Sequence, residues 1–228
     1  MLWPHARVKD TEDVKALSHI RLVTIARRSE ANVLKGKNMA DHYQTGVKME
    51  DLKGKLLVAT PALDQDVVFH HSVVYVYEHR KDGEHVGVIL NKPSEFRCTS
   101  LGALKGVQFA PALEDQVIHK GGPVSDTSIL LLHTSEWTST NTMTATDEVC
   151  MTSDALMLEK LAMGNEPNGW RMFAGMSVWQ RGQLEDEIAK GGWLVAEPSN
   201  HSIFDYATEE QYVKAIDLAA SKTFANYL

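Results

Sequence analysis

Two polar groups that could bind an anion or a carbonyl oxygen follow one apolar run of the sequence. The run 86–90 leads directly into Asn91, Lys92 and Pro93. Proline lacks a backbone N–H and pushes the preceding residue away from helical geometry, so the run should end there as a strand with a polar tip. The functional interpretation is a small-anion or carbonyl site formed by Asn91 and Lys92. The structural alternative, which we favour for this motif taken alone, is an asparagine that caps a turn.

A second segment of interest has a backbone that other groups can approach closely. It consists of Gly121, Gly122, Pro123 and Val124. Glycine has no Cβ, so either a phosphate or another strand could lie against this segment. The Gly-Lys-Ser/Thr sequence of a P-loop and the GxGxxG pattern of dinucleotide-binding proteins are both missing. A tight turn therefore explains the glycines equally well.

Four histidines, which are potential metal ligands, occur within a short stretch at positions 70, 71, 79 and 85. His79 and His85 flank a predicted turn at 81–84 and could meet across it. No HExxH motif and no Cys/His ligand spacing accompanies them. We interpret them as surface histidines at strand ends, and we expect neither a metal site nor another cofactor.

The sequence contains no recognisable nucleophile motif. A GxSxG elbow is missing, and Cys98 has no context of a known cysteine enzyme. Cys98 and Cys150 do not form a CxxC pair, which favours a reduced, cytosolic protein, although a single disulfide between them stays open. The acidic run 185–187 should fan around a helix and face solvent. No catalytic residue is predicted.

The elements that must position these residues begin near residue 49 and mix strands with helices. Strands are predicted at 55–60, 72–78, 85–90, 116–120, 128–133, 148–152, 170–178, 193–196 and 202–204, with 72–90 as a hairpin. A short helix is predicted at 99–105, a loop at 109–115 and a surface excursion at 136–146. The strands and helices do not alternate strictly, which indicates a single α+β domain with a mixed sheet.

Three further helices should close the domain. The first is capped by Thr152 or Ser153 and ends before Gly164. The second spans 180–190, and the third opens with a capping box from Thr208 to Gln211. The side chains expected to face the core are Met157, Leu158, Leu161 and Ala162 in the first helix, Leu184, Ile188 and Ala189 in the second, and Tyr212, Ile216 and Ala219 or Ala220 in the third.

Charge and hydropathy exclude several classes of protein. Residues 51–228 carry 14 Lys and Arg against 24 Asp and Glu, a net charge of −10. Nucleic-acid affinity depends on cations that neutralise phosphates, so we expect no direct binding to DNA or RNA. No apolar run approaches the length of about 20 residues that spans a bilayer. The first residues lack the apolar region of a signal peptide, so a soluble cytoplasmic protein with no membrane partner is expected.

The first 48 residues differ from the rest of the chain. Residues 13–31 place apolar side chains at near-helical spacing among several arginines, as in a membrane-surface or partner helix. We favour a weakly helical, poorly packed extension instead, since such segments gather at chain termini. Met39 and Met49 are alternative starts, and 36–48 has the composition of a linker. The predicted organisation is therefore an extension at 1–48 and a domain at 49–228.

Six segments in colinear order together resemble the YqgE/AlgH family of uncharacterised bacterial proteins, over about residues 50–220. These segments are Gly54–Pro61, Phe69–His79, Gly87–Pro93, Gly121–Val124, Met151–Asp154 and Trp179–Leu184. The chain departs from the family at Gly175–Trp179, where Met176 and Val178 replace an aromatic residue and a glycine. This departure argues against a close backbone approach at that point.

The resemblance implies a complex α+β fold whose sheet curls towards a small barrel, with helices packed around it. Members are often labelled transcriptional regulators, and no established catalytic residues can be carried over. No helix–turn–helix with a basic recognition helix can be placed here, so regulation would act through a protein partner.

We therefore favour a non-enzymatic binding or regulatory module that recognises a protein or a small molecule. The alternative is an enzyme in which Lys92 stabilises an anion electrostatically; partner identity and oligomeric state stay open. The predicted binding residues are Asn91, Lys92, Pro93, Gly121, Gly122, Pro123, Trp179 and Gln183.

Overall fold

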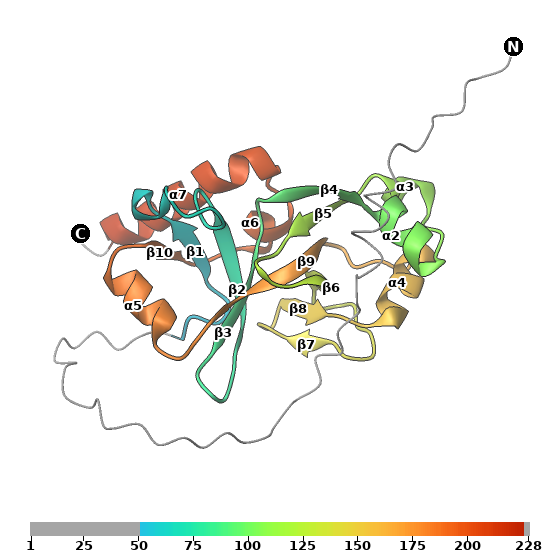
Figure 1. Cartoon of the computed structure of the whole chain (residues 1–228), viewed down its shortest axis with the longest axis horizontal. Coiled ribbons are helices and arrows are strands. Elements are labelled where there is room, and N and C mark those ends of the chain that lie inside the picture. Colours follow the sequence, from blue (N-terminus) through green and yellow to red (C-terminus); the bar gives the residue numbers. More distant parts are fainter. Residues whose placement is uncertain (1–50, 226–228) are drawn as a thin grey trace, which may run out of the picture.

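The computed structural model describes residues 51–225, with side chains described up to residue 221 (Figure 1). The predicted extension at 1–48 lies outside the described residues. The predicted domain is described from Asp51 onwards.

A ten-stranded sheet forms the framework, with its main strands in the order β10-β1-β2-β3-β9-β6-β8-β7. These neighbours are antiparallel, whereas β5 pairs in parallel with β9 and antiparallel with β4. The sheet is therefore mixed, as predicted. The strands are β1 (Leu56–Ala59), β2 (Val73–His79), β3 (His85–Ile89), β4 (Pro93–Arg97), β5 (Val117–Lys120), β6 (Val124–Thr134), β7 (Met143–Thr144), β8 (Val149–Thr152), β9 (Trp170–Trp179) and β10 (Trp193–Ala196).

The helices pack at the two ends of this sheet. Helices α5 and α7 lie at the end formed by β10 and β1, whereas α2 and α3 lie beside β4 and β5 towards the other end, with α4 close to them (Figure 1). The helical segments are the 3-10 turn η1 (Pro61–Leu63), α2 (Cys98–Lys105), α3 (Pro111–Glu114), α4 (Ala155–Ala162), α5 (Gln183–Ala189), α6 (Asn200–Phe204) and α7 (Thr208–Ala225).

Alternating residues of β2 enter two different cores, which explains why its sequence is continuously apolar. Val74 and Val76 pack with Trp179 on one face. Tyr75 and Tyr77 point to the other face, as the strand period of two requires. We call this second cluster the inner core.

The inner core also shows that the sheet curls. Tyr75 on β2 and Val149 on β8 belong to this one cluster, although β3, β9 and β6 lie between their strands in the sheet. Such contact requires the two ends of the sheet to bend towards each other. The structure confirms a single-domain α+β fold with a partly barrel-like mixed sheet surrounded by helices.

Two short helices correct the predictions from sequence. The segment 109–115 contains α3, because Pro111 stands at a helix N-terminus, where its missing N–H costs nothing. The predicted strand 202–204 is wrong, because this segment lies in α6. There, the side chains of Ser199 and Ser202 cap each other's backbone N–H groups.

The closing helices follow the predictions in part. The N-cap of α4 is Asp154, whose side chain accepts from the Met157 N–H, rather than Thr152 or Ser153. In α5 the predicted core residue Ala189 is exposed. The side chain of Gln211 donates to the Ser202 carbonyl (2.5 Å), and its Oε1 has no partner among the described residues, so the predicted capping box is not formed.

The remaining differences between the predictions and the structure concern which side chains are buried and where the elements begin and end. Along α7 the fully buried side chains include Ala215 and Ala219, while Tyr212 and Ile216 are partly buried. The strand expected at 128–133 begins earlier, as β6, and the excursion at 136–146 contains β7 and the buried Trp137. Predicted core residues Met157, Leu158 and Leu161 of α4 are buried.

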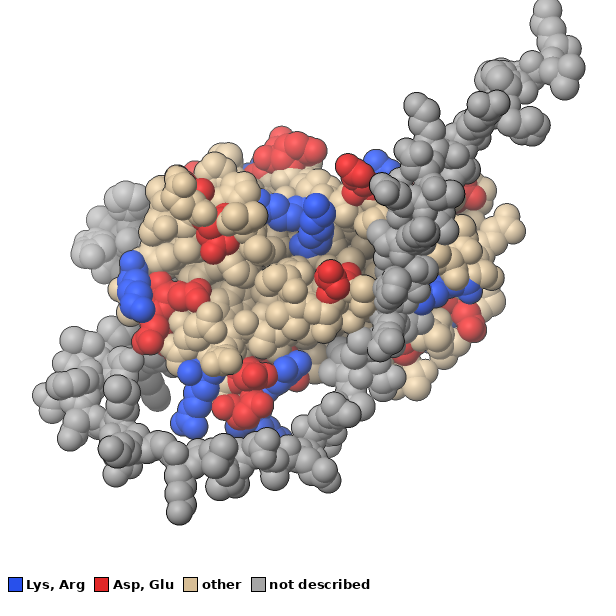
Figure 2. All heavy atoms as spheres, viewed as in Figure 1, with Lys and Arg blue, Asp and Glu red and all other residues tan. Residues whose placement is uncertain are grey.

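The face of the molecule in Figure 2 carries cations and carboxylates interspersed, with no broad basic area. Within residues 51–225, no helix combines the length and apolar character needed to cross a membrane.

Candidate functional site

The polar tip after β3 is tied to the chain that precedes β2. Asn91 Oδ1 accepts from the Val73 N–H (2.9 Å), and Asn91 Nδ2 donates to the His71 carbonyl (2.8 Å). Lys92 Nζ donates to the His70 carbonyl (2.8 Å), and burial lowers the pKa of this amine. These contacts match the structural alternative, in which Asn91 caps a turn.

The glycine pair after β5 lies against another strand. A Cβ on Gly121 would collide with the Gly175 carbonyl oxygen, and a Cβ on Gly122 would collide with Ser177 and Met176. Gly175 itself has a φ of 75°, which favours glycine. A neighbouring backbone therefore fills the space where a phosphate was considered. The expectation that Met176 and Val178 argue against close backbone approach here is wrong.

The structure brings the two predicted rim segments together. The Ile89 N–H donates to the Gly121 carbonyl (3.0 Å), and the Lys120 N–H donates to the Lys92 carbonyl (2.7 Å). Pro93 and Pro123 are both exposed. Whether this rim binds anything stays a prediction.

Trp179 and Gln183 converge on a single carboxylate, that of Glu187. Trp179 Nε1 donates to Glu187 Oε2 (3.0 Å), Trp193 Nε1 donates to the same oxygen (2.8 Å), and Gln183 Nε2 donates to Oε1 (2.9 Å). The expectation that the acidic run 185–187 simply faces solvent is therefore wrong for Glu187. Through the two indole hydrogen bonds, this carboxylate connects α5 to β9 and β10.

The histidines flanking the β2–β3 turn meet as predicted. The rings of His79 and His85 stack with centroids 4.3 Å apart. His85 is only 2% exposed, so its interpretation as a surface histidine is wrong. Its Nδ1 lies 3.8 Å from Glu185 Oε1, and burial lowers its pKa. Among residues 51–225 no three His, Cys, Asp or Glu side chains are grouped so that they could hold a metal ion.

Cys98 and Cys150 are free and buried, so they do not form the disulfide that the sequence left open. Burial raises the pKa of Cys98 to about 12. A thiol is nucleophilic as its thiolate, so Cys98 is poorly suited to nucleophilic catalysis.

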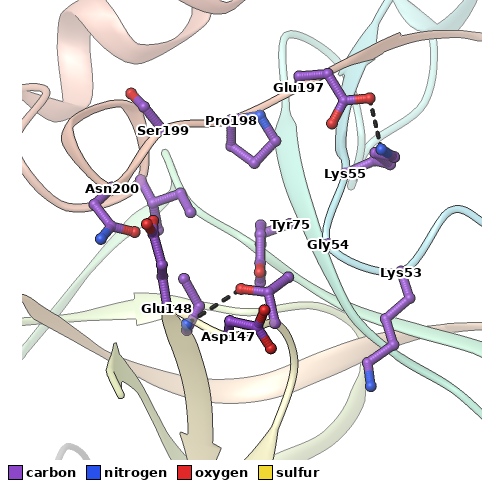
Figure 3. Close-up of a pocket in the computed structure, with 13 residues that line it drawn as sticks. Lys53, Gly54, Lys55, Tyr75, Asp147, Glu148, Glu197, Pro198, Ser199 and Asn200 are labelled. Carbon is purple, nitrogen blue, oxygen red and sulfur yellow. Dashed lines mark hydrogen bonds and ion pairs between the residues drawn. The ribbon is translucent and has the colours of Figure 1, made fainter. Parts of the chain in front are cut away.

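An open pocket of about 360 Å³ is lined by other residues than the eight predicted binding residues (Figure 3). Three segments form its walls: 53–55 at the start of β1, the turn 146–149 before and into β8, and 197–200 between β10 and α6. Gly54 allows the first two walls to meet, because its φ is 82° and a Cβ would press on the Thr146 side chain. The pocket therefore arises from segments far apart in sequence.

Tyr75 lies at the base of this pocket, at the top of the inner core. The residue is 0% exposed, and its hydroxyl has no hydrogen-bond partner of good geometry in the described part of the chain. Burial raises the pKa of Tyr75 to about 12, and the neighbouring Thr146 hydroxyl offsets part of this rise. The phenol is thus protonated at neutral pH and able to donate.

Charged side chains of both signs surround Tyr75. Figure 3 shows Lys53 and Lys55 to one side of it, and Glu148 and Asn200 to the other. Lys55 Nζ pairs with Glu197 Oε1 (2.5 Å), which neutralises one charge of each sign. No sequence pattern indicated this site, because Tyr75 lies in an apolar strand where an aromatic residue is expected for packing alone.

These features define a class of protein: a single α+β domain with a curled mixed sheet and an open polar pocket at its inner core. The chain belongs to the AlgH-like family, whose model matches residues 56–223. It is 37% identical over 167 residues to a UPF0301 protein of Marinomonas sp. (strain MWYL1), covering 73% of this chain and 88% of that relative. It is 33% identical over 173 residues to a UPF0301 protein of Vibrio cholerae serotype O1, covering 73% and 90%.

Two solved structures share the fold. The solution structure of the AlgH protein from Pseudomonas aeruginosa matches with a TM-score of 0.64 and 28% identity, covering 75% of this chain and 90% of that one. A crystal structure of a Corynebacterium diphtheriae protein matches with a TM-score of 0.59 and 22% identity, covering 73% and 86%. The second likeness bears on the fold alone.

Proposed function

We propose that this protein is a non-enzymatic binding module of the bacterial cytoplasm, and that its ligand site is the pocket over Tyr75. One observation carries the proposal, namely an open pocket of about 360 Å³ whose walls carry charged side chains of both signs. Pockets that bind small molecules combine a concave shape with a few polar groups that fix the orientation of the ligand.

Binding is favoured over catalysis because the groups suited to chemistry are engaged elsewhere. The Lys92 amine, which the enzymatic alternative needs, donates to a backbone carbonyl, and its partner Asn91 holds two backbone groups. In the pocket, the raised pKa of Tyr75 disfavours the phenolate that a general base would require. The rim at 91–93 and 121–123 is kept as a second candidate surface for a protein partner, on the strength of its exposed prolines.

Any regulatory role would be exerted through the bound ligand or a protein partner. The net charge of −10 over residues 51–228 opposes contact with a phosphate backbone. Free, buried cysteines are consistent with a reducing compartment.

The test is a ligand screen on the full-length chain by thermal shift, followed by calorimetry on wild type, Lys53→Met and the double variant Asp147→Asn/Glu148→Gln. Glu159→Gln, an exposed carboxylate on α4 outside the pocket, is the matched control. A polar ligand in the pocket loses a charged contact in at least one of the two pocket variants, so we expect that variant to bind it about tenfold more weakly and Glu159→Gln to bind it like wild type. Ligands that bind both pocket variants as tightly as wild type would contradict the proposal.

A further inference from the structure

We propose that the rim formed by residues 91–93 and 120–123 is a docking surface for an acidic segment of a protein partner, whose carboxylates pair with Lys92 and Lys120. The rim shares no residue with the lining of the pocket over Tyr75, so its partner can be tested independently of any ligand there. Three features of the rim carry the proposal: positive charge without a counter-charge, strained backbone beside it, and an exposed, rigid surface.

The two lysines of the rim lie directly opposite each other on neighbouring segments. The Lys120 N–H donates to the Lys92 carbonyl (2.7 Å), one step beyond the pair formed by Pro93 and His119. Residues that face each other in an antiparallel ladder have side chains on the same face, with Cβ atoms about 5 Å apart. Two cationic side chains therefore leave the backbone on the same face of the rim.

Neither lysine has a carboxylate partner among the described side chains, and the next carboxylates along the chain, Glu95 and Asp126, pair with neither. Lys92 Nζ donates to the His70 carbonyl, and burial lowers its pKa with no charged group to offset this effect. Lys120 is exposed. An ammonium group has three N–H donors, so Lys92 keeps two for oxygens of a partner. A carboxylate is the favoured acceptor, because hydrogen bonds between charged groups are the strong ones.

Strained backbone adjoins both segments of the rim. Apart from glycines, two of the described residues have a positive φ, His71 (50°) and Ser125 (51°). The side chain of Asn91 donates to the carbonyl of His71, and Ser125 follows the second segment with an exposed side chain, so burial does not explain its conformation. Residues with a Cβ rarely adopt this geometry, and where they do, the strain gathers at binding sites that the surrounding structure holds in place. The close contact of Gly121 with β9 holds this turn.

The exposed surface of the rim suits a protein segment. Pro93, Pro123 and the adjoining Val124 are exposed, and they lose little conformational freedom when a partner covers them. Sites for small molecules are concave, and a nucleic acid needs several cations along its backbone, whereas this surface is open and has two lysines. Charges farther away than about 8 Å are screened at physiological salt, so the two lysines determine the field at the rim although the domain is acidic.

The experiment selects ligands for the full-length protein from a phage-displayed library of random peptides and measures the selected peptides by fluorescence anisotropy. We expect the selected peptides to be enriched in Asp and Glu, and their affinity to fall as salt rises from about 50 to about 200 mM, because exposed charge pairs are screened. Replacing their carboxylates by amides should weaken binding at least about tenfold. A selection that yields no acidic peptides, or amide versions that bind equally well, would overturn the proposal.

Variants locate the site. Lys120→Met should weaken the acidic peptides by about tenfold and leave the fold intact, since this side chain is exposed, whereas Lys120→Arg keeps the charge and should bind close to wild type. Lys92→Met should show a similar loss, and its melting temperature is recorded beside it because the His70 carbonyl loses a donor. Lys81→Met removes an exposed lysine of the β2–β3 turn and is the matched control. Equal binding by Lys120→Met and Lys81→Met would overturn the proposal.

The outcomes also separate the classes of partner and the two surfaces. Glutarate, a small dicarboxylate, should bind far more weakly than the selected peptides, and equal affinity would overturn the assignment of a protein partner. Binding in the pocket depends on Lys53, Asp147 and Glu148, whereas binding at the rim depends on Lys92 and Lys120. Either proposal can therefore fail while the other stands.

Discussion

Some titratable side chains of this protein are buried, so the surrounding structure determines their hydrogen-bond partners and whether they hold a proton. Arg171 is the clearest case: its guanidinium donates to the carbonyls of Leu90 (3.1 Å), Phe204 (3.3 Å) and Tyr206 (2.5 Å). Burial lowers its pKa to about 10, so it remains protonated at neutral pH. The guanidinium thereby joins the end of β3 to the connection between α6 and α7.

The nearby His119 makes stability depend on pH. Burial first, and the charge of Arg171 second, lower its pKa from 6.5 to about 4. In the unfolded chain the histidine takes up a proton near pH 6.5, whereas in the folded protein it stays neutral until about pH 4. We therefore expect His119 to remove up to about 3 kcal/mol of the unfolding free energy as pH falls across this window, with little further loss below it.

The measurement is urea unfolding from pH 7.5 to pH 4 on wild type, His119→Gln and the control His201→Gln. His201 is an exposed histidine on α6. The stability of His119→Gln should fall less steeply with acid than that of wild type, while His201→Gln should follow wild type. Parallel curves for wild type and His119→Gln would rule out this role.

At the scale of elements, the stability of a short helix depends on its contacts with the sheet. Helix α5 spans only Gln183–Ala189, too short to be stable alone. The three hydrogen bonds that Glu187 accepts from Trp179, Trp193 and Gln183 hold it against the sheet. Sequence periodicity placed this helix but not its attachment, because the two tryptophans come from different strands.

Glu187→Ala should therefore destabilise the fold. Two buried indole N–H groups would lose their acceptor, which we expect to lower the unfolding free energy by about 2–3 kcal/mol. Chemical denaturation followed by tryptophan fluorescence measures this loss. Glu159→Ala on α4, whose carboxylate is exposed, should cost under about 0.5 kcal/mol, and an equal loss in both variants would refute the role of Glu187.

The contact between the β5–β6 turn and β9 allows a second test at this scale. A methyl group on Gly121 would meet the backbone oxygen of Gly175, which cannot move without disturbing β9. We expect Gly121→Ala to lower the unfolding free energy by about 3 kcal/mol or more. Gly164→Ala is the control, since its Cβ would meet nothing and only its φ of 75° opposes the change, at about 1–2 kcal/mol. Similar melting temperatures for the two variants would contradict this account.

For the whole molecule, the sequence predicted what local patterns determine. Apolar runs located the strands, including the β2–β3 hairpin in which His79 meets His85. Helix α6 was mistaken for a strand, because a segment of five residues is too short to show a clear period. The pocket over Tyr75 could not be predicted, because its walls come from segments up to about 145 positions apart and meet only when the sheet curls.

The charge of the whole molecule bears on the label of transcriptional regulator given to similar proteins. A protein that binds duplex DNA releases condensed counterions, so its affinity falls steeply with salt in proportion to the phosphates it neutralises. Residues 51–228 have ten more carboxylates than cations, and on the face shown in Figure 2 the cations stand among carboxylates.

We therefore expect purified residues 49–228 to show no salt-dependent binding to duplex DNA in anisotropy titrations between 50 and 200 mM salt. The full-length chain serves as the comparison, because residues 1–50 carry a net charge of +3. Sub-micromolar, salt-sensitive binding by residues 49–228 would show that a basic surface exists on this domain, and the proposal of regulation through a ligand or protein partner would then have to be abandoned.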